Sequence, residues 1–122
     1  MYLGGFLPIS FDMGLAHISN AKDWQAQVID SQRPVFVDFW AEWCGPCRMV
    51  GPVVEELAKD YDGRVNFVKV NVDEANELAA KYNIFSIPTL MLVNKGQVVA
   101  QQVGAASKEA YKNMIDRALS QA

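Results

Sequence analysis

The segment Pro34–Leu57, "PVFVDFWAEWCGPCRMVGPVVEEL", contains both cysteines of the chain. Its first seven residues form a nearly continuous apolar run of β-type residues, which predicts a strand buried on both faces. The residues from Cys44 to Gly63 predict a helix that ends at Asp62-Gly63. A buried strand that leads directly into a helix is typical of α/β proteins, so this segment sets the expected fold class.

The remaining segments continue this alternation and close with a hairpin. We expect strands at 16–19, 64–73, 89–93 and 97–105, and helices at 20–31, 74–84 and 107–122. The order βαβαβαββα favours parallel strands joined by crossover helices, with antiparallel strands added by the hairpin. The sequence therefore predicts an α/β domain with a central mixed five-stranded sheet and helices on both faces.

Composition narrows the range of functions. The chain has 122 residues, 51% of them hydrophobic, and a net charge of −3 without a basic cluster, which disfavours nucleic-acid or membrane binding. No apolar run approaches the ~18 residues of a membrane span. Residues 1–16 lack the basic start of a secretory signal. We expect them to be an N-terminal extension or leader outside the core, with the domain at 17–122 in an intracellular protein.

Cys44 and Cys47 could be a structural staple, part of a metal site or a redox pair. A disulfide between them closes a very short loop, which gives little stabilisation. A closed metal site needs four ligands, and the only histidine, His17, is distant in sequence. These features favour redox chemistry and predict no metal.

The start of a helix is a suitable place for a reactive thiol. Cys44 should lie among unpaired N–H groups at the positive end of the helix dipole, which stabilises a thiolate. Cys47 falls on the same side of the first turn, within reach of Cys44. Pro46 is tolerated there because its missing N–H is not needed.

Asp38 interrupts the apolar strand. A solvent-facing aspartate is one interpretation, but five of the seven residues in "PVFVDFW" are large and apolar, which favours burial. A buried carboxyl has a raised pKa and can exchange a proton near neutral pH. The expected donor of that proton is the thiol of Cys47.

Three further features have two interpretations each. Lys69 is either a surface lysine or a cation beside Asp38. Pro88 is either an ordinary strand-start proline or a cis residue in a loop facing the cysteines. Trp43, Ile87, Pro88 and Ala105 form either an apolar docking patch or scattered surface hydrophobics. The local sequence does not decide among these.

Taken together, "VDFWAEWCGPC", "VKVNVDEA", "IPTL" and "VGA" resemble the thioredoxin family in order and spacing. The resemblance runs from about His17 to the C-terminus and implies the thioredoxin fold. Residues 1–16 lie outside the family pattern. Arg48 replaces a lysine that is often found there, and Phe85-Ser86 stands where an Arg-Gly pair is common.

The resemblance also implies a protein-disulfide reductase with a redox-active Cys44–Cys47 disulfide and no bound cofactor. Cys44 would be the exposed nucleophile, Cys47 the buried resolving thiol, Asp38 the proton acceptor and Lys69 its partner. The implied substrate surface consists of Trp43, Gly45, Pro46, Ile87, a cis Pro88, Gly104 and Ala105.

The implied protein is a cytoplasmic monomer that maintains cell redox homeostasis. An NADPH-dependent thioredoxin reductase would supply electrons, and disulfide-containing proteins would receive them. Two alternatives remain open from the sequence. One is an oxidase or isomerase of a secretory compartment, and the other is a binding module in which redox turnover is incidental.

Overall fold

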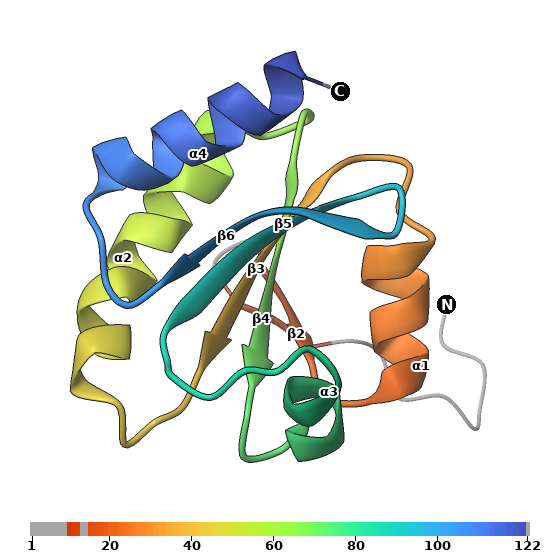
Figure 1. Cartoon of the computed structure of the whole chain (residues 1–122), viewed down its shortest axis with the longest axis vertical. Coiled ribbons are helices and arrows are strands. Elements are labelled where there is room, and N and C mark those ends of the chain that lie inside the picture. Colours follow the sequence, from red (N-terminus) through yellow and green to blue (C-terminus); the bar gives the residue numbers. More distant parts are fainter. Residues whose placement is uncertain (1–9, 13–14, 122) are drawn as a thin grey trace.

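The computed structural model describes residues 10–12 and 15–121. Strands and helices alternate along most of this length (Figure 1). The strands are β1 (Ser10–Asp12), β2 (Leu15–Ile18), β3 (Val35–Trp40), β4 (Asn66–Asn71), β5 (Thr89–Asn94) and β6 (Gln97–Val103). The helices are α1 (Ala21–Trp24), continued by the π-helical segment η1 (Gln25–Ile29), α2 (Gly45–Asp60), α3 (Asn76–Lys81) and α4 (Lys108–Ser120).

The strands form one mixed sheet in the order β1-β2-β4-β3-β5-β6. Strand β4 runs parallel to β2 and β3, whereas β5 is antiparallel to β3 and β6. The predicted strand that contains Asp38 is therefore central, with a neighbour on each side. The expected five-stranded mixed sheet, β2 to β6, and its helix order are confirmed.

A sixth strand, β1, extends the sheet beyond the predicted set. It pairs antiparallel with β2 and lies within the segment predicted to be an extension. Strand β2 begins at Leu15, and both Leu15 and Ala16 are buried. Strand β2 thus begins two residues before residue 17, the expected start of the domain, and that boundary itself stays a prediction.

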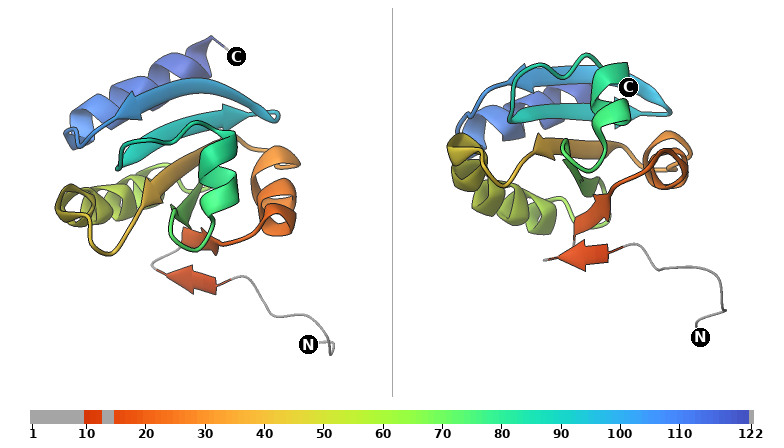
Figure 2. Two further views of the ribbon diagram at one scale, coloured as in Figure 1. Left: turned by 60° about the horizontal axis from the view of Figure 1, so that its bottom comes forward. Right: turned by 90° about the horizontal axis from the view of Figure 1, so that it is seen from below.

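Two apolar clusters cover the two faces of the sheet. Figure 2 shows α1 and α3 on one side and α2 and α4 on the other. Along β3, Val35, Val37 and Phe39 belong to the cluster that contains residues of α1 and α3. Phe36 points the other way, into the cluster beneath α2 and α4. Asp38 has the same parity as Phe36, so it lies on the α2 face.

Helices α1 and α4 each begin at a side-chain cap. The side chain of Asn20 accepts a hydrogen bond from the N–H of Asp23 at 2.8 Å, and Ser107 caps α4 by accepting from Ala110 at 3.1 Å. Helix α2 continues through Pro52. The first predicted helix differs in detail, because after Trp24 it continues as a π-helix to Ile29.

Candidate active site

The two cysteines form a disulfide at the start of α2. Cys44 occupies the N-cap position, and its Sγ accepts a hydrogen bond from the N–H of Cys47 at 3.2 Å. The two Cα atoms are 5.3 Å apart, a separation that the first helical turn provides. Pro46 lies in that turn without removing a helical hydrogen bond. One sulfur therefore lies at the positive end of the helix.

The two cysteines are equally buried, each with 4% of its surface exposed. The expected contrast between an exposed Cys44 and a buried Cys47 is therefore wrong for this disulfide form. The reason is local: Cys44 Sγ caps the helix and bonds to Cys47, and both residues pack with Ala41 against Trp40 and Ile87. The two cysteines differ in their position in α2, because Cys44 is the N-cap and Cys47 lies inside the first turn.

Two loops from distant parts of the sequence lie beside the disulfide. The Ile87–Pro88 peptide bond is cis, as the resemblance implied, and the Ile87 carbonyl oxygen lies 3.7 Å from Cys44 Sγ. The N–H of Gly104 donates to the Pro88 carbonyl at 2.8 Å. Gly104 has a φ of +88°, a conformation that favours glycine. The structure thus brings the predicted loop residues together around Cys44.

Asp38 is buried, with 1% of its surface exposed, as its apolar strand predicted. Within the described residues, neither of its carboxylate oxygens has a hydrogen-bond partner. Burial raises the pKa of Asp38 to about 7, and the Lys69 ammonium opposes that rise. Trp40 lies two residues after Asp38 on the same face of β3, and Trp40 packs against the two cysteines. A carboxyl with this pKa is suited to proton transfer at neutral pH.

Lys69 lies on β4, directly opposite Asp38 in the parallel register. Its Nζ sits 4.2 Å from the centre of the Trp40 ring, a cation–π arrangement. In the described part of the chain, Lys69 and Asp38 form no ion pair. Lys69 therefore acts on Asp38 through space, and its direct contact is the indole.

The residues of the implied substrate surface differ in exposure. Trp43 is 68% exposed, and its Nε1–H donates to Asp73 at 2.9 Å. Gly45, Pro46 and Ala105 are also exposed, whereas Ile87 and Gly104 are half-buried. Pro88 is buried, and its place in the substrate surface stays a prediction. Phe85, at 87% exposure, lies two residues before Ile87.

Comparison with known proteins identifies the family. The thioredoxin family model matches residues 16–117. The chain belongs to the thioredoxin family. It is 50% identical over 95 residues to a thioredoxin of Chlorobaculum thiosulfatiphilum, covering 78% of this chain and 88% of that one. It is 48% identical over 101 residues to a thioredoxin of Haemophilus influenzae, covering 83% and 94%.

Family membership and the Cys44–Cys47 disulfide establish this thioredoxin-family protein as a thiol–disulfide oxidoreductase. Thioredoxins need no cofactor beyond the redox-active disulfide. Within residues 10–12 and 15–121, no group of three or more histidine, cysteine or carboxylate side chains is arranged to hold a metal ion. In the same residues, no helix has the length and apolar character needed to cross a membrane.

A cavity of about 420 Å³ opens beside the thioredoxin-type disulfide on the side of Cys47. Its lining carries charged side chains of both signs. The lining residues are Trp40, Glu42, Cys47, Arg48, Gly51, Pro52, Glu55 and Lys69. Arg48 also donates to the Glu42 carbonyl at 2.8 Å, which ties α2 to the preceding turn. Cys47 thus borders a cavity that is also lined by charged side chains.

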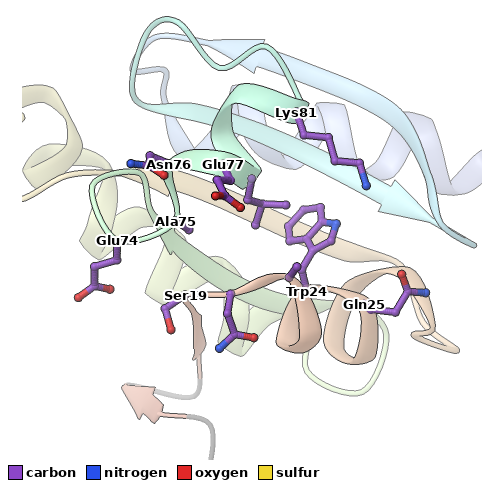
Figure 3. Close-up of a pocket in the computed structure, with 11 residues that line it drawn as sticks. Ser19, Trp24, Gln25, Glu74, Ala75, Asn76, Glu77 and Lys81 are labelled. Atoms are coloured by element: carbon purple, nitrogen blue, oxygen red, sulfur yellow. The ribbon is translucent and has the colours of Figure 1, made fainter.

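A larger cavity of about 530 Å³ lies away from the disulfide, between α1 and α3 (Figure 3). Trp24 forms part of its wall, and Glu74, Glu77 and Lys81 place charges around it. The Nε1–H of Trp24 is already bonded to the Tyr82 hydroxyl at 3.1 Å. None of the predicted site residues of this thioredoxin-family protein lines this cavity.

Two neighbours of the site were missed by sequence reasoning. Asp73 accepts the hydrogen bond from Trp43. In the sequence it is an ordinary loop aspartate after a strand, so no pattern marks it as a site residue. Tyr111 lies in the helix predicted at 107–122. It is buried, and its hydroxyl lies under the loop that carries Gly104. The signal was available, because a buried tyrosine needs a partner for its hydroxyl.

Proposed function

We propose that this protein reduces disulfide bonds in other proteins, and that the disulfide form described above is the product of that reaction. The single observation that carries the proposal is the Cys44–Cys47 disulfide at the N-terminus of α2, in a member of the thioredoxin family. Two electrons delivered to this bond give the dithiol. The dithiol then passes them, with two protons, to a substrate disulfide, whose S–S bond breaks as the Cys44–Cys47 bond forms again.

Cys44 is the proposed nucleophile. In the dithiol form its thiolate would keep the N-cap position, where the N–H of Cys47 and the helix dipole stabilise negative charge. The thiolate attacks one sulfur of the substrate disulfide. A mixed disulfide forms between Cys44 and the substrate, and the second substrate sulfur leaves as a thiolate that takes a proton from solvent.

Cys47 is the proposed resolving thiol, with Asp38 as its proton acceptor. The pKa of Asp38, about 7, leaves a substantial ionised fraction at neutral pH. The carboxylate accepts the thiol proton directly or through solvent, and the Cys47 thiolate attacks Cys44 Sγ. The substrate's remaining sulfur leaves as a thiolate, and the Cys44–Cys47 disulfide forms. Lys69 keeps the Asp38 pKa from rising further, because a nearby cation favours the carboxylate.

The proposed substrate surface surrounds the disulfide. Trp43, Gly45, Pro46 and Ala105 are exposed, and Ile87 and Gly104 are half-buried. The buried Pro88 accepts a hydrogen bond from the Gly104 N–H. A protein substrate with an extended segment next to its disulfide would contact this surface while its sulfur meets Cys44.

The electron source in this proposal is an NADPH-dependent thioredoxin reductase. NADPH supplies two electrons as a hydride, which matches the two electrons needed to open the disulfide. We propose a cytoplasmic monomer that carries electrons for cell redox homeostasis, because the cytosol keeps thiols reduced. Sedimentation velocity would test the monomer, and thiol trapping in intact cells would show whether the dithiol form predominates.

The competing direction of electron flow is oxidation or isomerisation of substrates. The reduction potential of Cys44–Cys47 decides between the two. A reductase requires a potential near or below that of the cytosolic glutathione pool. A potential far above that pool would overturn the reductase proposal and leave the family assignment intact.

The mechanism is tested by trapping the mixed disulfide. Cys47→Ser should form a stable covalent complex with a model substrate such as oxidised insulin chains, because the resolving thiol is missing. The matched control, Cys44→Ser, should trap nothing. Non-reducing electrophoresis and mass spectrometry identify the linked cysteine. Trapping through residue 47 in the Cys44→Ser variant would reverse the assigned roles.

A further inference from the structure

Tyr111 is a fully buried residue of α4 whose hydroxyl lies beneath the Gly104–Ala106 loop. The N–H of Ala106 donates to the hydroxyl oxygen at 2.9 Å, and the hydroxyl lies 3.4 Å from the Gly104 carbonyl oxygen, to which it donates. One phenol therefore pairs with backbone groups on both sides of Ala105. No other side chain among the described residues forms a hydrogen bond with this loop.

The loop beneath which Tyr111 lies is connected to the disulfide by a continuous series of contacts. Gly104 donates its N–H to the Pro88 carbonyl at 2.8 Å. The adjacent Ile87 carbonyl oxygen lies 3.7 Å from Cys44 Sγ. In Figure 1, strands β3 and β6 both run toward the end of the sheet where α2 begins, so their following loops lie near one another. A displacement of Gly104 would therefore shift the backbone of Ile87 and Pro88 next to Cys44 Sγ.

The phenol is held rigidly. Its ring packs edge-on against Phe36, with 5.9 Å between the ring centres, and Tyr111 has no exposed surface. Ser107 caps α4 four residues earlier, so the helix starts directly after the loop. Burial raises the pKa of Tyr111, so the hydroxyl stays protonated and keeps both its donor and its acceptor capacity. A fixed donor and acceptor beneath a short loop limit the conformations that the loop can adopt.

We propose that Tyr111 is a positioning residue that holds the Gly104–Ala106 loop in the conformation in which a protein disulfide docks at Cys44. This inference rests on the proposed function, because it concerns the binding of a protein substrate. Tyr111 touches neither the sulfurs nor the exposed surface. Its effect should appear in the binding of large substrates and leave the chemistry of the thiols unchanged.

The test compares Tyr111→Phe with Tyr61→Phe. Both variants remove one hydroxyl from a buried ring, but the Tyr61 hydroxyl bonds to Asp116 and the Lys112 carbonyl, away from the loop. For a protein disulfide, Tyr111→Phe should raise KM about three- to tenfold with kcat unchanged. The rate with a small disulfide such as oxidised glutathione should stay the same. Tyr61→Phe should leave all three quantities unchanged.

A second measurement does not depend on activity. Hydrogen exchange of the Ala106 amide should accelerate in Tyr111→Phe, because its acceptor is gone, and should not change in Tyr61→Phe. An unchanged KM, or an equal loss with the small disulfide, would overturn the positioning role. A wild-type protein that reduces no protein disulfide would overturn the proposed function instead. If hydrogen exchange of the Ala106 amide were also unchanged in Tyr111→Phe, the contact between the Tyr111 hydroxyl and the loop would be refuted as well.

Discussion

The two ends of α2 differ in whether the polar side chains beside them have hydrogen-bond or ion-pair partners. At the C-terminal end, the Tyr61 hydroxyl donates to Asp116 of α4, and Lys108 pairs with Asp60 at 2.9 Å. At the N-terminal end, the described residues provide no hydrogen-bond partner for either oxygen of Asp38. One end is paired and joins two helices. The other faces a buried carboxyl that has no hydrogen-bond partner in the described part of the chain.

The two carboxyls show what this difference does. Hydrogen bonds from Tyr61 and Lys112 lower the pKa of Asp116, whereas burial raises the pKa of Asp38 to about 7. Asp116 is therefore stabilised as a carboxylate and suits a structural role. Asp38 is poorly stabilised as a carboxylate, so it can exchange protons near neutral pH. The same residue type contributes stability at one end of the helix and reactivity at the other.

The largest expected effect is on stability, from Asp38→Asn. The folded protein holds the Asp38 proton up to about pH 7, whereas the unfolded chain releases it near pH 4. The free energy of unfolding therefore falls as pH rises between these values and is level above them. Asn cannot ionise, so the variant should exceed the wild type by roughly 3–4 kcal/mol at about pH 8 and match it near pH 4. Urea denaturation of the oxidised proteins measures this difference.

Asp116→Asn is the control for this comparison. Because the pKa of Asp116 is lowered, removing its charge should destabilise the protein at neutral pH, the opposite sign to Asp38→Asn. Equal stabilities of wild type and Asp38→Asn across this pH range would mean that folding does not raise the pKa of Asp38.

The second expected effect is on the rate of resolution of the mixed disulfide. In the wild type this rate should rise with pH with an apparent pKa near 7, as Asp38 ionises. In Asp38→Asn the inflection should disappear, and the rate near pH 7 should fall about 10- to 100-fold, since solvent alone must then accept the Cys47 proton. Rapid-mixing kinetics with a preformed mixed disulfide isolates this step. Asp116→Asn should behave as wild type, and an unchanged profile in Asp38→Asn would exclude the proposed proton acceptor.

The third expected effect tests the paired end. Tyr61→Phe removes the hydrogen bond to Asp116 and should lower the free energy of unfolding by about 1 kcal/mol at neutral pH, because the carboxylate is half-exposed and partly screened. A carboxyl with a lowered pKa loses its contribution as pH falls through that pKa, so the difference should shrink on acidification. Denaturation at about pH 7 and about pH 3 measures it. If Tyr61→Phe also lowered the rate of disulfide reduction, the C-terminal end of α2 would contribute to the reaction as well as to stability, contrary to this comparison.

Sequence patterns predicted the fold well, because the apolar run from Val35 to Trp40 and the order of elements are local features. They also predicted the burial of Asp38, since a carboxyl inside such a run has no exposed face. They did not predict the Tyr111 hydroxyl contacts, because these join α4 to a loop whose path depends on Gly104 and Pro88. The equal burial of Cys44 and Cys47 was missed because it comes from packing against Trp40 and Ile87 and from the disulfide itself.

The smallest expected effect concerns partner choice at the reactive end. Phe85 is 87% exposed two residues before Ile87, so a docked protein would cover apolar surface that an arginine would not offer. Phe85→Arg should lower kcat/KM about two- to threefold for a disulfide flanked by apolar residues, and raise it similarly for one flanked by acidic residues. The control Gln101→Arg adds the same charge on exposed β6 and should change neither value. Equal shifts in both variants would assign the effect to net charge, which would remove Phe85 from the docking surface.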